Sequence, residues 1–449
     1  MRLLDRSGRG THGAMAPAPG ATRAWSVVAV LLVLAVLASV DRNAIALMVD
    51  PIRASLGIND FQMGLLQGPA FAVFFLIGSL PMGWIVDRYS QQWAIYLGVS
   101  GWSLATIACG LAGSFYELLI ARCLVGLGEA VLQPAGWSIV ARLFPPHRLG
   151  LVIGVLSAGA QIGAAASYML GAFLIAGASR FAAMPLPLVG QLAPWQLVFL
   201  AAGVPGLLLA ALIFIAPSHR PLRPGPARQA GGGLMAFIRG NRGFLTYHFL
   251  GFSLHSAAVF GAAAWMPTYL LRNHELDVRT VGGILALLAV PVGAGGVLFA
   301  GWLVDRSFGR GRDDAHLTHF ACVAALIAVI GGLGFNFAAS LPAIVLTFGL
   351  IQFLQPFSGV SGAVLQISTP VEFRGRISAA YIMFYNAVGM TLGPSFVVFL
   401  GDYVIGPGKL GTALALTYAL FGSAAAILLW LGRKHAARAV QRHGRIQPS

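Results

Sequence analysis

The sequence is dominated by apolar runs that are too long for a soluble core, such as Trp25–Val40 and Ala321–Phe335. About 20 helical residues cross the hydrocarbon of a bilayer, so runs of this length are typical of membrane-spanning helices. Charged residues make up 10% of the chain, whereas a soluble domain carries about 25%. The chain is therefore predicted to be a multi-pass, all-α integral membrane protein.

Short polar gaps separate the apolar runs and divide them into twelve predicted spans. Twelve spans place both ends of the chain on the same side of the membrane. The predicted ranges are 25–49, 63–86, 93–113, 117–143, 149–176, 195–216, 244–271, 279–304, 315–337, 341–369, 374–403 and 410–432.

The distribution of basic residues predicts the orientation. With both termini inside, 22 of the 29 Lys and Arg residues fall in inside segments and 5 in outside segments. Cytoplasmic segments carry this excess in membrane proteins, so both termini are predicted to be cytoplasmic. The basic residues are nearly all Arg, and Ala and Gly are abundant, which favours a bacterial inner membrane.

The net charge of +15 has a related explanation. The charges lie in the gaps between spans, where they suit anionic lipid headgroups. No basic helix or aromatic-basic patch occurs, so nucleic acid is not an expected partner.

A Pro- and Gly-rich inside segment, 217–243, separates the first six spans from the last six. Such a segment is unlikely to pack as a core. The predicted organisation is a cytoplasmic tail at 1–24, a six-helix bundle at 25–216, a cytoplasmic linker at 217–243, a second six-helix bundle at 244–432 and a cytoplasmic tail at 433–449.

An internal repeat supports this division. Gly83-Trp84-Ile85-Val86-Asp87-Arg88 follows the second span, and Gly301-Trp302-Leu303-Val304-Asp305-Arg306 follows the eighth. Because six spans preserve orientation, the halves are parallel repeats. A twelve-helix fold of two pseudo-symmetric six-helix bundles is therefore predicted.

The Gly-x-x-x-Asp-Arg pattern in both loops resembles the signature of the major facilitator superfamily. The resemblance implies alternating access, with the two loops helping to hold the inner gate shut. An acid at the rim can face the positive N-terminus of a neighbouring helix. The predicted gating residues are Gly83, Asp87, Arg88, Gly301, Asp305 and Arg306.

The first half also resembles the spinster family, through Asp41-Arg42-Asn43 and the block Arg122-Cys123-Leu124-Val125-Gly126-Leu127-Gly128-Glu129-Ala130. Membership would imply proton-linked transport, with lysophospholipids and sphingosine phosphates as the best-known cargo. After the block this chain carries Val131-Leu132-Gln133-Pro134, where animal relatives are richer in hydroxyls. Cargo identity therefore carries over poorly.

Four charged residues lie within predicted spans: Asp41, Arg42, Arg122 and Glu129. A charge in hydrocarbon costs several kcal/mol, so it normally faces a cavity or a partner. Glu129 is predicted near the midplane, and Asp41 is the better-placed partner for Arg122. Glu129 and Asp41 are the candidate proton-coupling residues. Arg42, Arg122 and Gln133 are the candidate substrate-binding residues.

The alternative for these four residues is a fixed ion pair that only joins helices. Histidines 248 and 255, on one face of the seventh span, are either proton relays or packing residues. No Gly-x-Ser-x-Gly, Walker loop or metal-spaced cluster occurs, so neither an enzyme nor a cofactor or metal is expected.

The favoured function is a monomeric, proton-coupled secondary transporter of an amphipathic or anionic small molecule, such as a lysolipid or a sphingolipid-like molecule. Two alternatives remain. The first is an organic-anion or multidrug transporter of the same fold. The second is a non-transporting membrane sensor, which would need no acid in the cavity.

Overall fold

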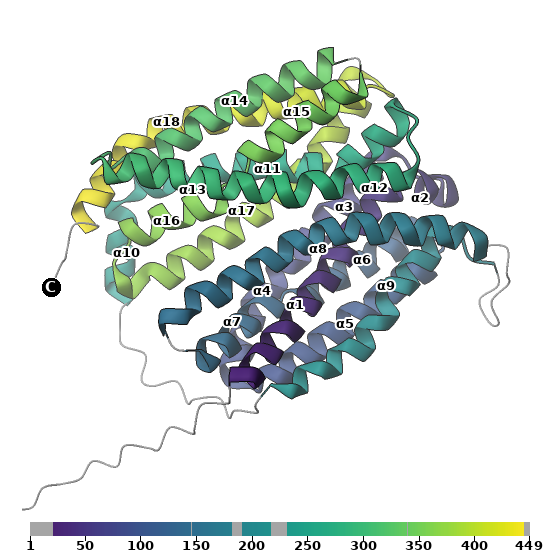
Figure 1. Ribbon diagram of the computed structural model, residues 1–449, viewed down its shortest axis with the longest axis horizontal. Coiled ribbons are helices and arrows are strands. Elements are labelled where there is room, and N and C mark those ends of the chain that lie inside the picture. The colour runs from purple at the N-terminus through teal and green to yellow at the C-terminus, as the bar shows by residue number, and fades with distance from the viewer. Residues whose placement is uncertain (1–20, 145, 182–190, 217–230, 339, 444–449) are drawn as a thin grey trace, which may run out of the picture.

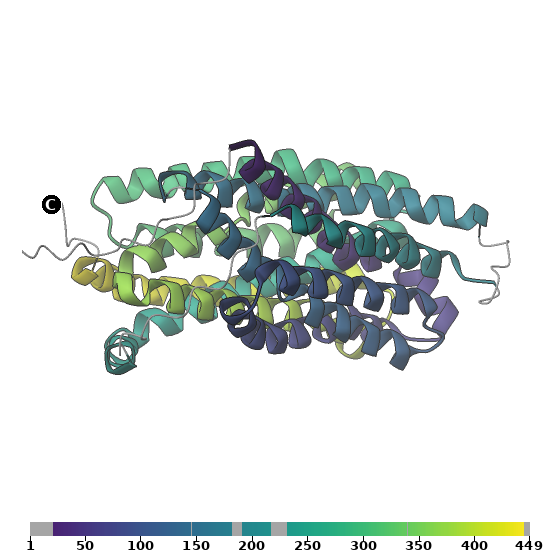
Figure 2. The same ribbon diagram turned by 90° about the horizontal axis from the view of Figure 1, so that it is seen from below.

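The computed structural model of the protein describes residues 21–144, 146–181, 191–216, 231–338 and 340–443. Within these ranges all the regular structure is helical. The two halves of the chain form two helical bundles that lie side by side (Figure 1). A view from below shows the helices of both bundles running in broadly the same direction (Figure 2).

The helices of the first half match the first six predicted spans. Four of these spans consist of two helical segments each. The elements are α1 Ala21–Asn43 with η1 Ala44–Leu47, α2 Val49–Leu56, α3 Asp60–Gln67 with α4 Pro69–Arg88, α5 Gln91–Leu111, α6 Phe115–Glu129 with α7 Leu132–Leu143, α8 Pro146–Phe181, and α9 Pro194–Ala210 with η2 Ala211–Ile215.

The second half repeats this plan over the last six predicted spans. A short helix, α10, precedes it. The elements are α10 Gly231–Gly240, α11 Arg242–Asn273, α12 Val278–Leu287 with η3 Leu288–Val292 and α13 Gly293–Gly309, α14 Ala315–Phe337, α15 Leu341–Leu354 with α16 Ser358–Ser368, α17 Val371–Phe399 with η4 Leu400–Ile405, and α18 Leu410–His443.

The twelve-helix fold is confirmed. Ten helical stretches in the described part of the chain are long and apolar enough to cross a membrane. The two remaining predicted spans are α6 with α7, which is interrupted, and α8, which runs over Pro146–Phe181 and includes the apolar stretch Ile162–Gly177. Large apolar side chains such as Leu208, Leu298 and Phe337 are about three-quarters exposed on the outer surface, as contact with lipid requires.

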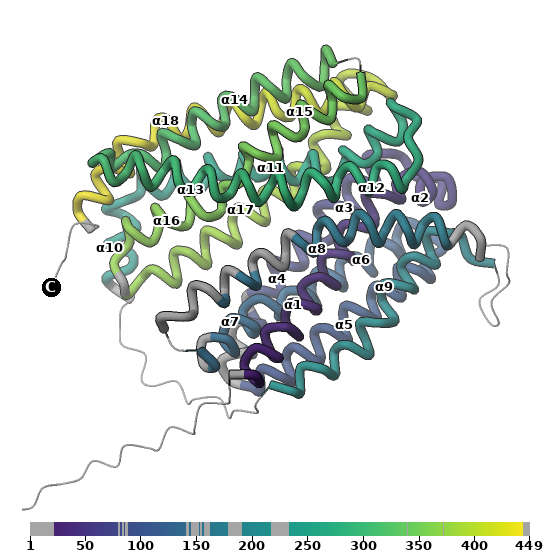
Figure 3. Tube along the Cα trace, in the orientation of Figure 1, coloured from purple at the N-terminus to yellow at the C-terminus, as the bar shows by residue number. Residues whose placement is uncertain are grey.

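Two faces of the molecule are distinguished below. The terminal face is the end where α1 begins and α18 ends, with α10 beside it, as the Cα trace shows (Figure 3). The far face is the opposite end, where α2 connects α1 to α3 and where α11 ends at Asn273. The terminal face is the one that the sequence predicts to be cytoplasmic.

Helical structure extends into the predicted linker and the predicted C-terminal tail. Within the range 217–243, α10 is helical, and its Phe237 packs against Phe373 of α17 with ring centroids 6.0 Å apart. At the other end, α18 continues beyond residue 432 to His443 because Ala436, Ala439 and Val440 are buried. The turns after residue 432 therefore pack on the bundle.

Three spans are interrupted, and a proline follows each interruption. Pro69 begins α4 directly after Gly68, and Pro134 lies in the first turn of α7. Pro356 lies between α15 and α16. Proline lacks the N–H that would bond the carbonyl four residues earlier, so a continuous helix is broken at these points.

The two bundles contact each other chiefly through two pairs of spans, and η1 also packs on α11. Helices α3 and α4 pack on α17, and α8 packs on α12 and η3. Glycine permits the close approach at both contacts. A Cβ atom on Gly68 would lie 2.5 Å from the main-chain oxygen of Met390, and one on Gly282 would lie 2.7 Å from that of Tyr168.

Candidate functional site

The charged residues of α1 and α6 come together inside the first bundle. Arg42, at the end of α1, donates from Nη2 to Oε2 of Glu129 at 2.5 Å. Glu129 is the last residue of α6, directly before the interruption of that span. Its side chain is 1% exposed, whereas that of Arg42 is 36% exposed. Arg42 is thus the member of the pair that an incoming molecule can reach.

Arg122 and Asp41 form a second, buried contact beside this pair. Nη1 of Arg122 donates to the main-chain oxygen of Asp41 at 3.1 Å. The Asp41 carboxylate instead accepts a hydrogen bond from the hydroxyl of Thr106 in α5 at 3.2 Å. Arg122 and Asp41 are therefore neighbours, as expected, but they meet through the main chain and not through a carboxylate–guanidinium pair.

The ring of Phe71 in α4 contacts both guanidinium groups. Its ring centroid lies 4.9 Å from Cζ of Arg42 and 5.9 Å from Cζ of Arg122. A ring face attracts a cation at such distances, more strongly in a desolvated site. Phe71 is fully buried, so this contact fixes the arginines without closing access to Arg42.

A cavity with two lobes lies between the bundles. The Glu129 lobe, of about 390 Å³, is lined by Arg42, Glu129 and Gln133 of the first half and by Tyr385 and Asn386 of the second. Apolar groups complete its wall, including Phe75, Leu132, Trp137 and Leu156. Both halves therefore contribute to this lobe, as alternating access at a central site requires.

The Gln67 lobe, of about 360 Å³, adjoins the first. Asn43, Gln67, Tyr168, Gln352 and Gln355 provide its polar groups. Arg42 lines both lobes, as do Ser39, Ser358 and Met390. Arg42, whose guanidinium is accessible, thus lies where the two lobes meet.

The predicted binding and coupling residues divide into two sets. Arg42, Glu129 and Gln133 line the cavity. Asp41 and Arg122 are buried behind it and line neither lobe. Sequence reasoning identified all five residues but not the pairing of Arg42 with Glu129.

The two histidines of α11 also lie outside both lobes. Nε2 of His248 lies 3.1 Å from the main-chain oxygen of Ser361, and Nε2 of His255 lies 3.0 Å from that of Gln355. Aromatic rings surround both side chains. This environment favours the packing interpretation over a proton relay.

The predicted gating residues lie at the terminal face. Gly83, Asp87 and Arg88 occupy the last turns of α4, and their side chains lie outside the described part of the structure. Gly301, Asp305 and Arg306 occupy the corresponding turns of α13, where Cζ of Arg306 lies 5.6 Å from the Trp302 ring centroid.

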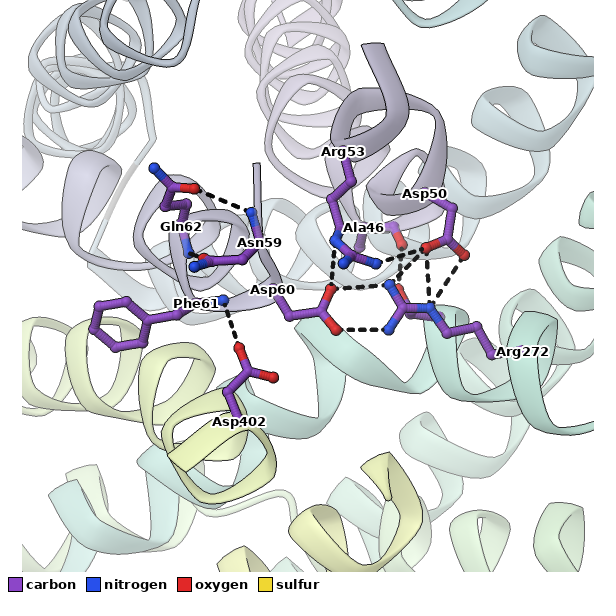
Figure 4. A network of polar contacts seen from close by, with 10 residues as sticks. Ala46, Asp50, Arg53, Asn59, Asp60, Phe61, Gln62, Arg272 and Asp402 are labelled. Carbon is purple, nitrogen blue, oxygen red and sulfur yellow. Dashed lines mark hydrogen bonds and ion pairs between the residues drawn. The ribbon is translucent and has the colours of Figure 1, made fainter. Parts of the chain in front are cut away.

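An ion network at the far face was not predicted. Arg272 of α11 donates to Asp50 of α2 and to Asp60 of α3, with shortest distances of 2.5 Å and 2.7 Å (Figure 4). Arg53 lies 3.0 Å from Asp60 as well. Oδ2 of Asp402 in η4 accepts a hydrogen bond from the main-chain N–H of Phe61 at 3.2 Å. These contacts tie the two halves together at the far face.

A sequence signal for this network was available. Asp50, Arg53, Asp60 and Arg272 all lie at predicted outside ends of spans, where opposite charges from different spans can meet. The order of the helices around the bundle decides which of these ends are neighbours, and the sequence does not give that order.

Known proteins resemble this chain over nearly its full length. The family model of the Major Facilitator Superfamily matches residues 31–394. An MFS-type efflux pump of Mycolicibacterium smegmatis is 26% identical over 419 residues, which cover 92% of this chain and 93% of the pump. A probable galactarate/D-glucarate transporter of Bacillus subtilis is 25% identical over 441 residues, 91% of each chain.

The fold has a counterpart among solved structures. The crystal structure of a bacterial homologue of the human lysosomal transporter Spinster, in its inward-facing and unoccupied conformation, superposes with a TM-score of 0.77. It is 23% identical, and the match covers 96% of this chain and 100% of the other. The chain belongs to the major facilitator superfamily of membrane transporters and has a spinster-like fold.

Proposed function

We propose that the protein is a proton-coupled secondary transporter of an organic anion, and that it works by alternating access. The observation that carries this proposal is the Arg42–Glu129 ion pair in the wall of a cavity between the two halves. An anion binding there needs a cation, and Arg42 is the accessible one. Glu129 competes with that anion for the same guanidinium.

Competition for Arg42 couples protons to cargo. Ionised Glu129 holds the guanidinium, so an anion must displace a carboxylate in order to bind. Protonated Glu129 carries no charge and leaves Arg42 free to pair with the anion. Protonation and anion binding therefore favour each other, and by linkage each raises the affinity for the other.

The residues behind the cavity act on this pair in the proposed mechanism. Arg122 keeps the end of α1 in place through its bond to the Asp41 carbonyl, and so sets the position of Arg42. Asp41 offers a second carboxylate that can take up a proton or hold an arginine when the cavity is empty. Gln133, one turn after Glu129, contributes a neutral hydrogen-bonding group for the cargo.

The gating proposal concerns the terminal face. Asp87 and Arg88 in α4, and Asp305 and Arg306 in α13, are proposed to hold that face closed in the state opposite to the one described here. Gly83 and Gly301 allow the helices to approach in that state. The far-face ion network plays the corresponding part in the present state.

The cargo class rests on the cavity walls and on one relative. The relative from Bacillus subtilis is named as a probable galactarate/D-glucarate transporter, which supports an organic acid as the cargo. The apolar groups of the Glu129 lobe favour a second candidate, an amphipathic anion such as a lysolipid or a drug. We place the protein in a bacterial inner membrane, as a monomer with cytoplasmic termini.

The test compares two modes of transport in the same proteoliposomes. Glu129→Gln removes the titrating group and keeps the shape of the side chain. The variant should still exchange labelled anion across the membrane but should lose accumulation driven by a pH gradient. Glu117→Gln is the matched control, because Glu117 lies in the first turn of the same helix and is exposed.

Full pH-driven accumulation by Glu129→Gln would exclude Glu129 as the coupling acid. If the wild-type protein exchanges none of these classes of compound, namely sugar acids, aromatic acids, drugs and lysolipids, the sensor alternative would be favoured.

A further inference from the structure

We propose that the Gln67 lobe is a hydroxyl-recognising subsite, in which the amides of Gln67 and Gln355 bind hydroxyl groups of a carboxylate cargo held by Arg42. The inference rests on the proposed function, since it places the cargo's acid group at Arg42. It adds the chemistry of the other end of the cargo, which is a hydroxylated organic acid and not an acyl chain.

Gln67 is the first reason for this assignment. It is the last residue of α3, at the interruption before Gly68, and it lines the lobe. It is 9% exposed, and neither its amide oxygen nor its amide nitrogen has a hydrogen-bond partner among the described residues. Buried polar groups of folded proteins are nearly always paired, so a fully unpaired amide in a cavity wall indicates a ligand site.

Gln355 presents a matching group from the second half. It follows α15 at the interruption of the tenth span, directly before Pro356. Its Nε2 donates to Oε1 of Gln352, and its Oε1 is buried without a partner in the described part of the chain. Its main-chain oxygen is already engaged by His255. The free side-chain oxygen is therefore held in position by two contacts.

The helix interruptions place these amides where cargo binds in this architecture. Interrupted spans near mid-membrane form the substrate sites of many secondary transporters. Glu129 lies at the interruption of the fourth span, and Gln355 lies at that of the tenth, which is its counterpart in the second half. The same structural device thus presents an acid from one half and an amide from the other.

The chemistry of the lobe selects among ligands. An amide offers an acceptor and donors, and a hydroxyl group both donates and accepts, so hydroxyls pair with Gln67 through both of its polar atoms. An acyl chain would leave these buried atoms unpaired, which is unfavourable. No acidic residue occurs among the described residues that line the lobe, so a cation has no partner there.

Arg42 connects the two parts of the site. It lines both lobes, so a carboxylate bound to it can extend its hydroxyl-bearing end toward Gln67. The hydroxyls can belong to a sugar acid or to a phenolic acid, whose ring would suit the Phe260, Phe348 and Phe357 walls of the lobe. The shared chemistry is a carboxylate with hydroxyl groups at its far end.

The experiment measures binding of matched acid pairs to the full chain in lipid nanodiscs by titration calorimetry. One pair is gluconate and hexanoate, and the other is 3,4,5-trihydroxybenzoate and benzoate. At least one hydroxylated acid should bind about tenfold or more tightly than its unhydroxylated partner. The pair that shows the preference distinguishes a sugar acid from a phenolic acid.

Gln67→Leu and, separately, Gln355→Leu should reduce this preference about tenfold and leave the unhydroxylated acid unchanged. Gln366→Leu is the control, because Gln366 is an exposed glutamine outside both lobes. Melting temperatures of all variants show whether each remains folded, and two independent variants keep the test decisive.

Two results would overturn the inference. One is a wild-type protein that binds lysophosphatidylglycerol but prefers neither hydroxylated acid. The other is an unchanged preference in both leucine variants. A separate result would contradict the proposed function itself. If Arg42 does not bind the cargo's acid group, Arg42→Ala would leave the affinity for all four acids unchanged, independently of the results for the glutamine variants.

Discussion

Arg272 and Asp60 form a two-point ion pair between the two halves of the transporter. Nη1 of Arg272 lies 2.7 Å from Oδ2 of Asp60, and Nη2 lies 2.9 Å from Oδ1. The same guanidinium also binds Asp50, so one side chain of the second half holds two carboxylates of the first (Figure 4). This geometry joins the two halves directly at the far face and, in the proposed mechanism, keeps that face closed.

The first prediction concerns that closure. Arg272→Gln should shift the population about tenfold or more toward a state open at the far face, because hydrogen bonds to charged groups contribute about 1.5–3 kcal/mol. Spin labels at exposed positions 55 and 409, one in each half, should report a longer distance. Arg279→Gln is the control, since Arg279 is exposed and has no ion pair within the described chain. An unchanged distance distribution would show that packing alone closes this face.

The second prediction uses two adjacent glycines of α12. A Cβ on Gly282 would lie 2.7 Å from both the Tyr168 oxygen and the Ala172 side chain, whereas one on Gly283 would meet nothing within 4 Å. Gly282→Ala should therefore force α12 from α8 and favour opening at the far face. Gly283→Ala should leave the contact between α12 and α8 intact. Both substitutions raise helix propensity by about 1 kcal/mol, so the difference between them reports the contact alone. The same label pair measures the difference, and equal behaviour of the two variants would contradict the contact.

The third prediction separates the buried Arg122 from the accessible Arg42. Arg122→Ala should lower stability by about 1–3 kcal/mol, because it leaves the buried main-chain oxygen of Asp41 without its donor. Arg42→Ala removes an accessible arginine and should mainly weaken anion binding. Thermal unfolding of the purified variants, measured beside calorimetric titration with an acid, distinguishes these effects. Equal losses of stability would mean that Arg42 is structural.

The fourth prediction concerns the terminal face. Asp305→Asn removes a charge at the end of α13 that is proposed to stabilise closure of this face. The variant should populate the state open at the terminal face more than the wild type does. Spin labels at positions 90 and 310 should report the longer distance, with Asp313→Asn as the control in the following turn. A longer distance in Asp313→Asn but not in Asp305→Asn would contradict the prediction, because it would assign closure of this face to Asp313.

The spans and their order could be predicted because hydrophobic length and basic-residue asymmetry are local properties of the chain. The interruptions were missed, although Pro69, Pro134 and Pro356 mark all three. These prolines lie within apolar runs whose hydropathy is continuous, so span counting joined the segments on either side. The missing N–H groups alone would not have located them, because Pro81, Pro205, Pro267, Pro291 and Pro394 lie inside helices.

The site was predictable in composition but not in its pairing. Position along a span gives the depth of a residue in the membrane, which is why Glu129 and Arg42 were both identified. Rotation of each helix about its axis and the choice of neighbouring helix are set by packing between distant segments. These factors direct Arg42 to Glu129 and leave Arg122 on the Asp41 carbonyl, and no single-span pattern contains them.

The prolines at the interrupted spans also determine what can change in this cavity over evolution. Because proline has no N–H, the carbonyls of Ala130 and Gln352, four residues before Pro134 and Pro356, receive no bond from those positions. Their dipoles belong to the main chain, so no side-chain substitution at the same residue removes them. Mutation can exchange arginine, glutamate or glutamine and so retune selectivity for solutes, but the main-chain oxygen of Gln352, a residue of the cavity wall, is inherited with the backbone.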